Sequence, residues 1–481
     1  MWVVRISRKN ETIDSAAHSY NYTYDLAGRL IEVRKDGILS SRYTYDANGN
    51  RFNYTGSGGA VTGTYDDRDR LMQYSAATYT YTANGELLSK INGSETTSYH
   101  YDVLGNLLNV TLGSLNLNPD PQNGVLTGSA LGNITDTIGY SSFGEAAAYQ
   151  AFSSATNIFS VNYTRDDLGR ISRKNETING AAHSYNYTYD LAGRLTEVWK
   201  DGILLSRYTY DANGNRLSYT GSDGAVTGTF DDQDRLMQYG AATYAYTANG
   251  ELLSKTNGSQ TSSYHHDVLG NLLNVTLPGG TKIDYIVDGQ NRRIGKKVND
   301  VLVQGFLYEN QLSPIAELDG SGNVVSRFVY ASRGNVPDYM VRGGNTYRII
   351  TDHLGSPKIV IDVATGAVAQ RMDYDEFGNV ILDSNPGFLP FGFAGGLYDR
   401  DTKLVRFGAR DYDAEAGRWT VKDPILFDGN SENLYMYVKD NPINLIDPLG
   451  LLEVQISPKI PKNPVIDKDI NKFNFCPINT R

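Results

Sequence analysis

Short stretches in which aromatic and polar residues alternate run along most of the chain. In SYNYTYD, the tyrosines at positions 20, 22 and 24 alternate with Ser, Asn and Thr. Residues two apart in a strand point to the same side, so these tyrosines are expected on one face. Asp25 and Gly28 then have the spacing of a type I turn, in which glycine is free to take a positive φ.

The stretch after this turn, RLIEVRKDG, predicts a returning strand. Regular alternation would place Leu30, Glu32 and Arg34 on one face and Ile31 and Val33 on the other. The unit is therefore a predicted β-hairpin. One hairpin is only marginally stable in water, so successive hairpins are expected to pair side by side into one sheet.

The hairpin unit recurs with a period of about 20 residues. Its instances share an aromatic residue, usually tyrosine, often followed by aspartate and a glycine turn, and stand at positions 24, 45, 65, 81, 101, 189, 210, 230, 246, 266, 285, 330 and 374. A tyrosine stripe of this kind is typical of core packing, although it could also offer a sugar- or peptide-binding surface.

A larger repeat lies above this period. Residues 5–112 match residues 170–277 at a constant offset of 165, with 16 differences in 108 positions. So close a match indicates a recent duplication. The first copy begins inside a repeat unit, which indicates an incomplete N-terminus.

The pattern predicts an all-β chain whose sheet curls, because a twisted open sheet of many strands does not stay flat. A solenoid, a propeller and a closed shell all satisfy the periodicity. The best helical candidate is residues 143–155, FGEAAAYQAFSSA, and its pattern is ambiguous.

Composition narrows the function classes. The net charge of −10 gives no general attraction to nucleic acid, and the six scattered histidines give no metal-binding spacing. The single cysteine, Cys476, excludes an internal disulfide framework. We find neither a signal peptide nor an apolar run long enough to span a membrane, and we expect no cofactor.

The repeated YDxxGRL unit resembles the YD repeat of the Rhs family, which also occurs in Tc toxin shell subunits and in teneurins. Three further stretches resemble the Rhs repeat-associated core: DHLGSPKIVIDVATGAVAQRMDYDEFGNV (352–380), FGFAGGLYDRDTKLVRFGARDYDAEAGRWTVKDP (391–424) and NLYMYVKDNPINLIDPLGL (433–451). Repeats and core together cover nearly the whole chain up to Leu451.

The resemblance implies a tandem-hairpin β-sheet that spirals into a partial hollow shell, with the C-terminal core as a plug. The expected organisation is first-copy repeats (1–112), a connecting β segment (113–169), second-copy repeats (170–277), degenerate repeats (278–350), the Rhs core (351–451) and a short variable tail (452–481). A chain of this length is expected to form an open shell.

The resemblance also implies an intramolecular aspartic protease site that cuts after a DPxGL sequence, here between Leu451 and Leu452. The residues that match are Asp423 and Asp447, with Arg410 upstream. Two carboxylates that share a proton can act as base and acid on a peptide bond. Two features weigh against this site: Asp-Pro is a common turn starter, and Leu426 stands where related sequences carry glycine.

The predicted function is a bacterial, secreted or cell-surface shell that encloses its own C-terminal polypeptide, with at most a single-turnover self-cleavage. Secretion machinery and cell-surface carbohydrate are further possible partners; nucleic acid is not expected. The alternatives are a non-catalytic adhesion or carbohydrate-binding repeat protein and a truncated fragment without independent function. The 30 residues after the cut are too few for a complete toxin domain.

Overall fold

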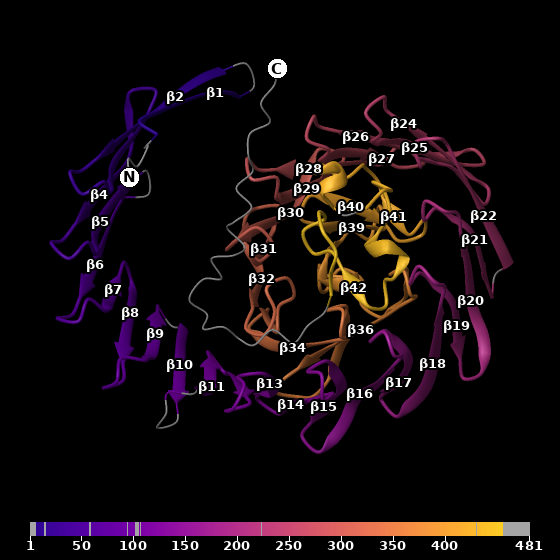
Figure 1. Ribbon diagram of the computed structural model, residues 1–481, viewed down its shortest axis with the longest axis horizontal. Coiled ribbons are helices and arrows are strands. Elements are labelled where there is room, and N and C mark those ends of the chain that lie inside the picture. Colours follow the sequence, from indigo (N-terminus) through magenta and orange to yellow (C-terminus); the bar gives the residue numbers. More distant parts are fainter. Residues whose placement is uncertain are drawn as a thin grey trace. The chain divides into compact units, whose positions relative to one another are not determined.

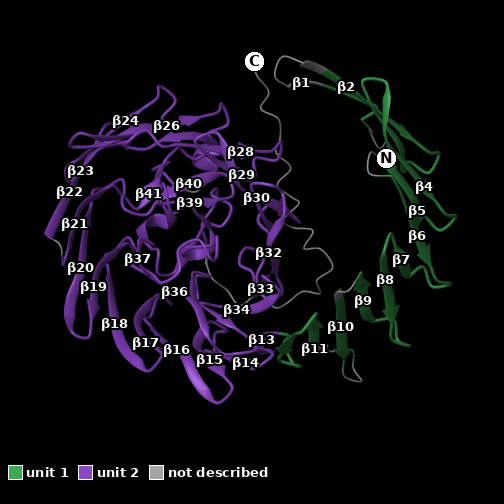
Figure 2. Cartoon of the chain, turned by 180° about the vertical axis from the view of Figure 1, so that it is seen from behind, with its two compact units in different colours: residues 1–124 green, residues 125–481 purple. Residues whose placement is uncertain are grey.

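A computed structural model describes residues 6–13, 16–56, 59–93, 95–101, 105, 107–222, 224–429 and 431–455 (Figure 1). The described residues form β-strands, turns and three short 3-10 helices, and none of them belongs to a helix that could cross a membrane. The chain divides into two compact units, residues 1–124 and 125–481 (Figure 2).

Unit 1 is an antiparallel meander in which each strand pairs with the next along the chain. Its strands are β1 (Arg8–Ile13), β2 (Ala16–Tyr24), β3 (Leu30–Lys35), β4 (Ile38–Tyr45), β5 (Arg51–Gly56), β6 (Gly59–Tyr65), β7 (Leu71–Tyr74), β8 (Ala77–Tyr81), β9 (Leu87–Asn92), β10 (Glu95–Tyr101), β11 (Leu107–Leu112) and β12 (Leu115–Pro119).

Unit 2 continues the same pattern from β13 to β37 and ends in short elements. Its elements are β13 (Leu126–Leu131), β14 (Ile134–Tyr140), β15 (Ala146–Ser153), β16 (Thr156–Arg165), β17 (Ile171–Ile178), β18 (Ala181–Tyr189), β19 (Leu195–Lys200), β20 (Ile203–Tyr210), β21 (Arg216–Gly221), β22 (Gly224–Phe230), β23 (Leu236–Tyr239), β24 (Ala242–Tyr246), β25 (Leu252–Asn257), β26 (Gln260–His266), β27 (Leu272–Thr276), β28 (Lys282–Val287), β29 (Arg293–Val298), β30 (Val301–Tyr308), β31 (Pro314–Asp319), β32 (Val324–Val329), β33 (Tyr339–Arg342), β34 (Asn345–Thr351), β35 (Pro357–Asp362), β36 (Val368–Tyr374), β37 (Val380–Asp383), η1 (Phe393–Gly395), β38 (Leu397–Tyr398), β39 (Leu404–Phe407), β40 (Arg410–Asp413), β41 (Arg418–Trp419), η2 (Leu426–Gly429), η3 (Val438–Asp440), β42 (Leu445–Ile446) and β43 (Val454–Gln455).

The helical candidate at residues 143–155 is a strand. Residues 146–153 form β15, which pairs with β14 on one side and β16 on the other. In an all-β chain this ambiguous apolar stretch joins the sheet, because both neighbouring strands supply backbone partners.

The predicted turn at the YD motif is confirmed. The Gly28 N–H donates to the Asp25 carbonyl at 2.9 Å, and Gly28 has a φ of 83°. The Asp25 carboxylate accepts from the backbone N–H and the Nε of Arg29, at 2.8 and 2.7 Å. The Arg29 guanidinium also lies 4.8 Å from the ring centre of Tyr45, so the motif links each hairpin to the next.

The predicted faces of the returning strand are wrong. A β-bulge interrupts the register after the turn, so that Tyr24 pairs with Leu30 but Tyr22 pairs with Val33. The extra residue brings Leu30 and Val33 to the same face. In the second copy, the equivalent residues Leu195 and Val198 are both fully buried.

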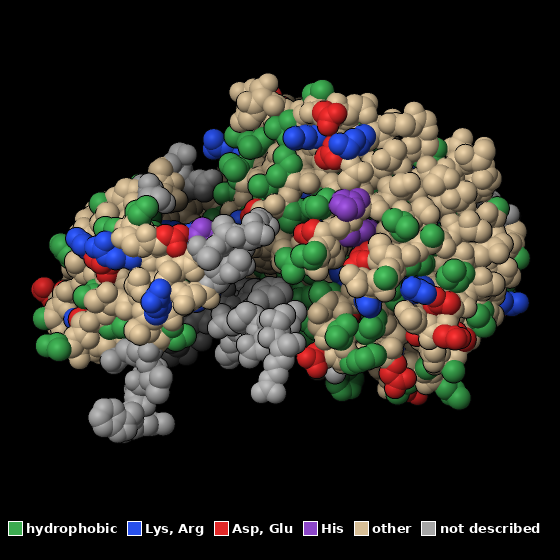
Figure 3. All heavy atoms as spheres, turned by 90° about the horizontal axis from the view of Figure 1, so that it is seen from above, with side chains coloured by type: hydrophobic (Ala, Val, Ile, Leu, Met, Phe, Trp, Pro, Cys, Tyr) green, Lys and Arg blue, Asp and Glu red, His purple; other side chains and the backbone are tan. Residues whose placement is uncertain are grey.

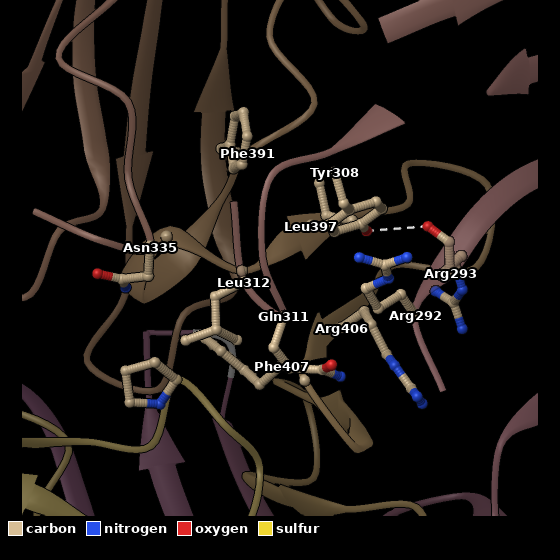
Figure 4. A pocket seen from close by; sticks show the side chains of 14 residues that line it. Arg292, Arg293, Tyr308, Gln311, Leu312, Asn335, Phe391, Leu397, Arg406 and Phe407 are labelled. Carbon is tan, nitrogen blue, oxygen red and sulfur yellow. Dashed lines mark hydrogen bonds between the residues drawn. The ribbon is translucent and has the colours of Figure 1, made fainter. Parts of the chain in front are cut away.

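The tyrosine of each YD motif has a hydrogen-bonding role besides its packing. In many motifs the hydroxyl donates to a backbone carbonyl of the preceding hairpin, as for Tyr308 and the Arg293 carbonyl at 2.9 Å (Figure 4). The same bond occurs for Tyr45 to Leu30, Tyr81 to Leu71, Tyr101 to Leu87, Tyr140 to Leu126, Tyr189 to Ile171, Tyr210 to Leu195 and Tyr330 to Pro314. Tyr285 and Tyr374 differ, since their hydroxyls donate to the Asp399 carboxylate and to the Met372 sulfur.

His266 occupies this tyrosine position, and neither of its ring nitrogens has a hydrogen-bond partner. Burial lowers the pKa of His266 to about 4. We expect His266→Tyr to raise the free energy of unfolding by about 1 kcal/mol, because the new hydroxyl would reach the Leu252 carbonyl. The duplicated Tyr101, which bonds Leu87, is the natural precedent. Chemical denaturation measures the effect, and an unchanged or lower midpoint would contradict it.

The sheet of unit 2 winds through one turn until distant strands meet. Arg348 on β34 binds Asp136 on β14 at 2.7 Å and Ser129 on β13 at 2.9 Å. Apolar residues of β14 and β16 also share a buried cluster with β34 and β35. This turn is completed by side chains, since no strand pairing among the described residues closes the sheet into a barrel.

The C-terminal part of unit 2 fills the inside of this turn (Figure 1, yellow). We call its residues 385–455 the plug. Buried ion pairs fasten the plug to the sheet: Arg293 to Asp411 at 2.8 Å and Lys296 to Asp399 at 2.7 Å. The centre of the plug is aromatic, with Phe407, Tyr412, Trp419 and Tyr437 in mutual contact.

Surface charge is mixed. On the face shown in Figure 3, Lys and Arg side chains lie among Asp and Glu side chains, without a single large basic patch. The net charge of −10 agrees with this distribution. Neither observation favours a nucleic acid partner.

Candidate functional site

The three residues proposed for self-cleavage lie on three separate parts of the plug. Arg410 begins β40, Asp423 follows β41, and Asp447 directly follows β42. The structure brings them together: Arg410 Nη2 lies 2.8 Å from Asp423 Oδ2 and 3.3 Å from Asp447 Oδ2. All three residues are buried.

Each aspartate also organises a turn. Asp423 Oδ1 accepts from the Ile425 N–H at 3.0 Å, and its carbonyl accepts from the Leu426 N–H at 2.9 Å. Leu426 takes a φ of 54° in this turn, a conformation that favours glycine. The turn thus forms with leucine in place of glycine.

The Asp447 carboxylate is hydrogen-bonded to the backbone at the proposed cut. Its Oδ1 accepts from the N–H groups of Leu451 and Leu452, at 3.0 and 3.1 Å. The Leu452 nitrogen would be the leaving group if the bond between these leucines were hydrolysed. The carboxyl of Asp447 is therefore within reach of the atom that must receive a proton.

Arg410 and Asp423 lie on the carbonyl side of the Leu451–Leu452 bond. Arg410 Nε donates to the Gly450 carbonyl at 2.6 Å, and its guanidinium lies 4.2 Å from the ring centre of Trp419. A Cβ placed on Gly429 would lie 2.9 Å from Asp423 Oδ2 and 3.2 Å from the Leu451 carbonyl oxygen. Asp423 and the carbonyl to be attacked thus face the same small space.

That space is a cavity of about 10 Å³, lined by residues that include Arg410, Asp423, Gly429, Asp447 and Leu451. A cavity of this size is about the minimum that holds one water molecule. Sequence reasoning missed Gly429, whose lack of a side chain leaves this space open. The only signal was a glycine six residues after Asp423.

The two carboxyl groups are arranged through the arginine. Both contact Arg410 Nη2, and no hydrogen bond joins Asp423 to Asp447 directly among the contacts of the described residues. Burial raises the pKa of Asp423 to about 6 and also raises the pKa of Asp447. The arginine opposes this shift, since its positive charge favours the ionised carboxylates.

The raised pKa predicts a pH-dependent stability. Between about pH 4 and pH 6, the folded protein keeps a proton on Asp423 that the unfolded chain has lost, so stability falls as pH rises through this window. The contribution is at most ~3 kcal/mol. Two other buried carboxyls, Glu376 and Asp440, have raised pKa values of about 7 and about 8 and act in the same direction.

The test is denaturation at pH 4.5 and pH 7 for the wild type and for Asp423→Asn. Because asparagine does not titrate, the stability difference between the two pH values should shrink in the variant. An equal difference in both proteins would contradict the assignment.

No group of three or more His, Cys, Asp or Glu side chains in the described part of the chain is arranged to hold a metal ion. The side chains that meet at the site are two carboxyl groups and one guanidinium. The proposed tail, residues 452–481, is described only as far as residue 455.

Comparison with known proteins places the chain in a family. The family model Teneurin YD-shell matches residues 2–123 and 111–443. Teneurin-3 of Danio rerio is 31% identical over 317 residues, which cover 62% of this chain and 11% of that protein. Teneurin-4 of Homo sapiens is 30% identical over 311 residues, with the same coverage.

A bacterial relative is also similar. The tRNA3(Ser)-specific nuclease WapA of Bacillus spizizenii is 29% identical over 268 residues, which cover 53% of this chain and 11% of that protein. The chain thus spans about a tenth of the length of the curated relatives it matches.

Solved structures agree on the fold. The TcdB2-TccC3-TEV structure matches 91% of this chain and 26% of its own, with a TM-score of 0.64 at 17% identity. The TcdB2-TccC3 structure matches 90% and 27%, with a TM-score of 0.62 at 18% identity. The sheet wound around a plug, the YD turns and the family match lead to one conclusion: the chain belongs to the teneurin YD-shell family and is a YD-shell protein of the Rhs type.

Proposed function

We propose that this chain is a shell protein that encloses its own C-terminal polypeptide and cuts it free between Leu451 and Leu452. The observation that carries the proposal is the arrangement around that bond. Asp447 accepts hydrogen bonds from the N–H groups of Leu451 and Leu452, and Arg410 donates one to the Gly450 carbonyl. A water-sized cavity is lined by Asp423 and Leu451.

In the proposed reaction, Asp423 takes a proton from water as the water oxygen bonds to the Leu451 carbonyl carbon. Asp447 gives a proton to the Leu452 nitrogen as the carbon–nitrogen bond breaks. Arg410 orients both carboxyl groups. The peptide is part of the same chain, so tethering supplies the effective concentration and a separate substrate cleft is unnecessary.

The cargo is the polypeptide that follows Leu451, and the expected location is secreted or at the cell surface. The similarity to a tRNA3(Ser)-specific nuclease of Bacillus spizizenii supports a bacterial chain whose cargo is an effector. The similarity to TcdB2-TccC3 supports a shell that surrounds its contents, through the fold alone.

The test compares four variants with the wild type in a time course on denaturing gels. Asp423→Asn and Asp447→Asn should abolish cleavage, and Arg410→Lys should slow it at least tenfold, because lysine cannot hold both carboxyls and the Gly450 carbonyl. Asp428→Asn is the matched control, since Asp428 is exposed on η2 in the same segment. Cleavage that persists in Asp447→Asn would refute the site.

A further inference from the structure

The duplicated segments differ in their surroundings. In the second copy, residues 170–277 form a plug-binding face. Its hydrogen bonds with the plug include Ile171 N–H to Asn444 Oδ1 (2.8 Å), Asn433 Nδ2 to Asn215 Oδ1 (2.8 Å), Arg216 Nη2 to the Glu415 carbonyl (2.5 Å), Arg418 to the Asp234 carbonyl, Tyr435 hydroxyl to the Gly250 carbonyl (2.7 Å) and Lys255 Nζ to Glu415 (2.8 Å).

None of the second-copy residues in these contacts differs between the copies. At the offset of 165, they correspond to Ile6, Asn50, Arg51, Asp69, Gly85 and Lys90. One of the 16 differences does contact the plug: the Arg418 guanidinium lies 4.9 Å from the ring centre of Phe230, which is Tyr65 in the first copy, and tyrosine keeps the aromatic ring. The first copy therefore carries every side chain and every glycine that these contacts with the plug require.

Each of these first-copy residues is more exposed than its duplicate. Ile171 is 1% exposed and Ile6 is 66% exposed. A Cβ on Gly250 would lie 2.3 Å from the Tyr435 hydroxyl, whereas a Cβ on Gly85 would meet nothing within 4 Å. Arg51 and Lys90 are exposed as well.

One binding residue of the first copy, Arg51, also has the placement of its duplicate. Arg51 lies over the ring of Tyr74 at 5.1 Å, and Arg216 lies over the duplicate ring, Tyr239, at the same 5.1 Å. A side chain already held in its bound position loses little entropy on binding. Arg51 is thus already held where its duplicate binds the plug.

We infer that residues 5–112 form a second plug-binding face, which takes the plug of another copy of this chain. The occupant must supply the same partners, namely the Asn433, Tyr435 and Asn444 side chains and the acidic Asp413 and Glu415. The negative charges of Asp413 and Glu415 are complementary to the positive charge of Lys90. The result is an exchange of plugs between shells, of the domain-swapping kind.

A plug prefers its own chain. Its tether raises its effective concentration there, and Arg293 and Lys296, which lie beyond the second copy, add buried ion pairs to Asp411 and Asp399. Residues 5–112 contain no duplicate of those two. The first-copy face is therefore filled only by a plug that has been released from its own sheet.

The test uses a donor chain in which charge reversals weaken the binding of its plug to both of its own faces. The donor carries Arg216→Glu and Lys255→Glu in the second copy and Arg51→Glu and Lys90→Glu in the first. Mixed with the wild-type chain at tens of micromolar, it should form a 1:1 complex of twice the 53.0 kDa chain mass by sedimentation or native mass spectrometry.

The partner chain that receives the donor's plug is the acceptor, and variants of the acceptor show which face the plug binds. Arg51→Glu with Lys90→Glu in the acceptor should weaken the complex at least tenfold. Arg68→Glu should leave it unchanged, since Arg68 is replaced by Gln233 in the occupied copy and is therefore not required. No complex with the wild type, or equal binding to all acceptors, would overturn the inference.

A second donor tests the inference independently, in case the first donor does not fold. Asp411→Ala removes the buried ion pair that fastens the plug to Arg293 on the sheet, without altering either face. It should dimerise at high concentration and lose the dimer when Arg51→Glu and Lys90→Glu are added in the same chain. Dimers that survive this addition, or a chain that stays monomeric, would contradict the inference.

Discussion

Replacing Asp411 by alanine should lower the free energy of unfolding of unit 2 by about 3–5 kcal/mol, because it leaves two buried guanidinium groups without their anion. Asp411 lies 2.8 Å from Arg293 on the sheet and 3.0 Å from Arg406 on the plug. All three residues are almost completely buried.

The measurement is chemical denaturation followed by tryptophan fluorescence, to which Trp419 in the aromatic centre of the plug contributes. Asp411→Asn is the control, since it keeps the shape and some hydrogen bonds but loses the charge, and should fall between the wild type and Asp411→Ala. A loss below 1 kcal/mol for Asp411→Ala would show that the ion cluster does not fasten the plug.

Replacing Gly450 by alanine should reduce self-cleavage by a factor of about 100 or more, because it displaces the turn that carries the cut. Gly450 has a φ of 65°, and a Cβ there would lie 2.4 Å from the Phe407 carbonyl oxygen and 2.9 Å from the Arg410 nitrogen. The backbone of residues 447–452 must then move away from Arg410.

The control for backbone strain is Gly322→Ala. Gly322 also has a positive φ, 83°, but its Cβ would meet nothing within 4 Å. It should cost some stability and leave the cleavage rate unchanged. Equal cleavage rates for Gly450→Ala and the wild type would indicate that the position of this turn does not matter for the reaction.

Local features were accessible from the sequence. The Asp25–Gly28 turn follows from residue type and spacing, and it forms as expected because both requirements lie within four residues. The bulge after it was missed, since an extra residue in one strand leaves no mark in a pattern that already mixes polar and apolar positions. The hydroxyl bond of Tyr308 was also missed, because its acceptor lies in the previous hairpin.

Long-range features were less accessible. The periodicity was equally compatible with a solenoid, a propeller and a shell, because the winding depends on the summed twist of many strands. Contacts such as Arg348 to Asp136, 212 residues apart, determine where the turn of unit 2 is completed. The sequence around Arg348 or Asp136 does not indicate that the two residues pair.

The candidate site contains both local features, which the sequence predicts, and long-range features, which it does not. Spacing alone favoured turns at Asp423 and Asp447, and both are turn residues. Only the resemblance singled them out as a pair with Arg410. The position of the arginine between the two carboxyls, and the two amide groups held by Asp447, depend on the folded plug and could not be read from spacing.

The most direct test of the account is the mass of the purified wild-type chain under denaturing conditions. Self-cleavage predicts two species, one that ends at Leu451 and one that begins at Leu452, with Asp447→Asn giving the intact chain alone. A wild-type chain that remains at the full 53.0 kDa after prolonged incubation, or a cut at another bond, would contradict it.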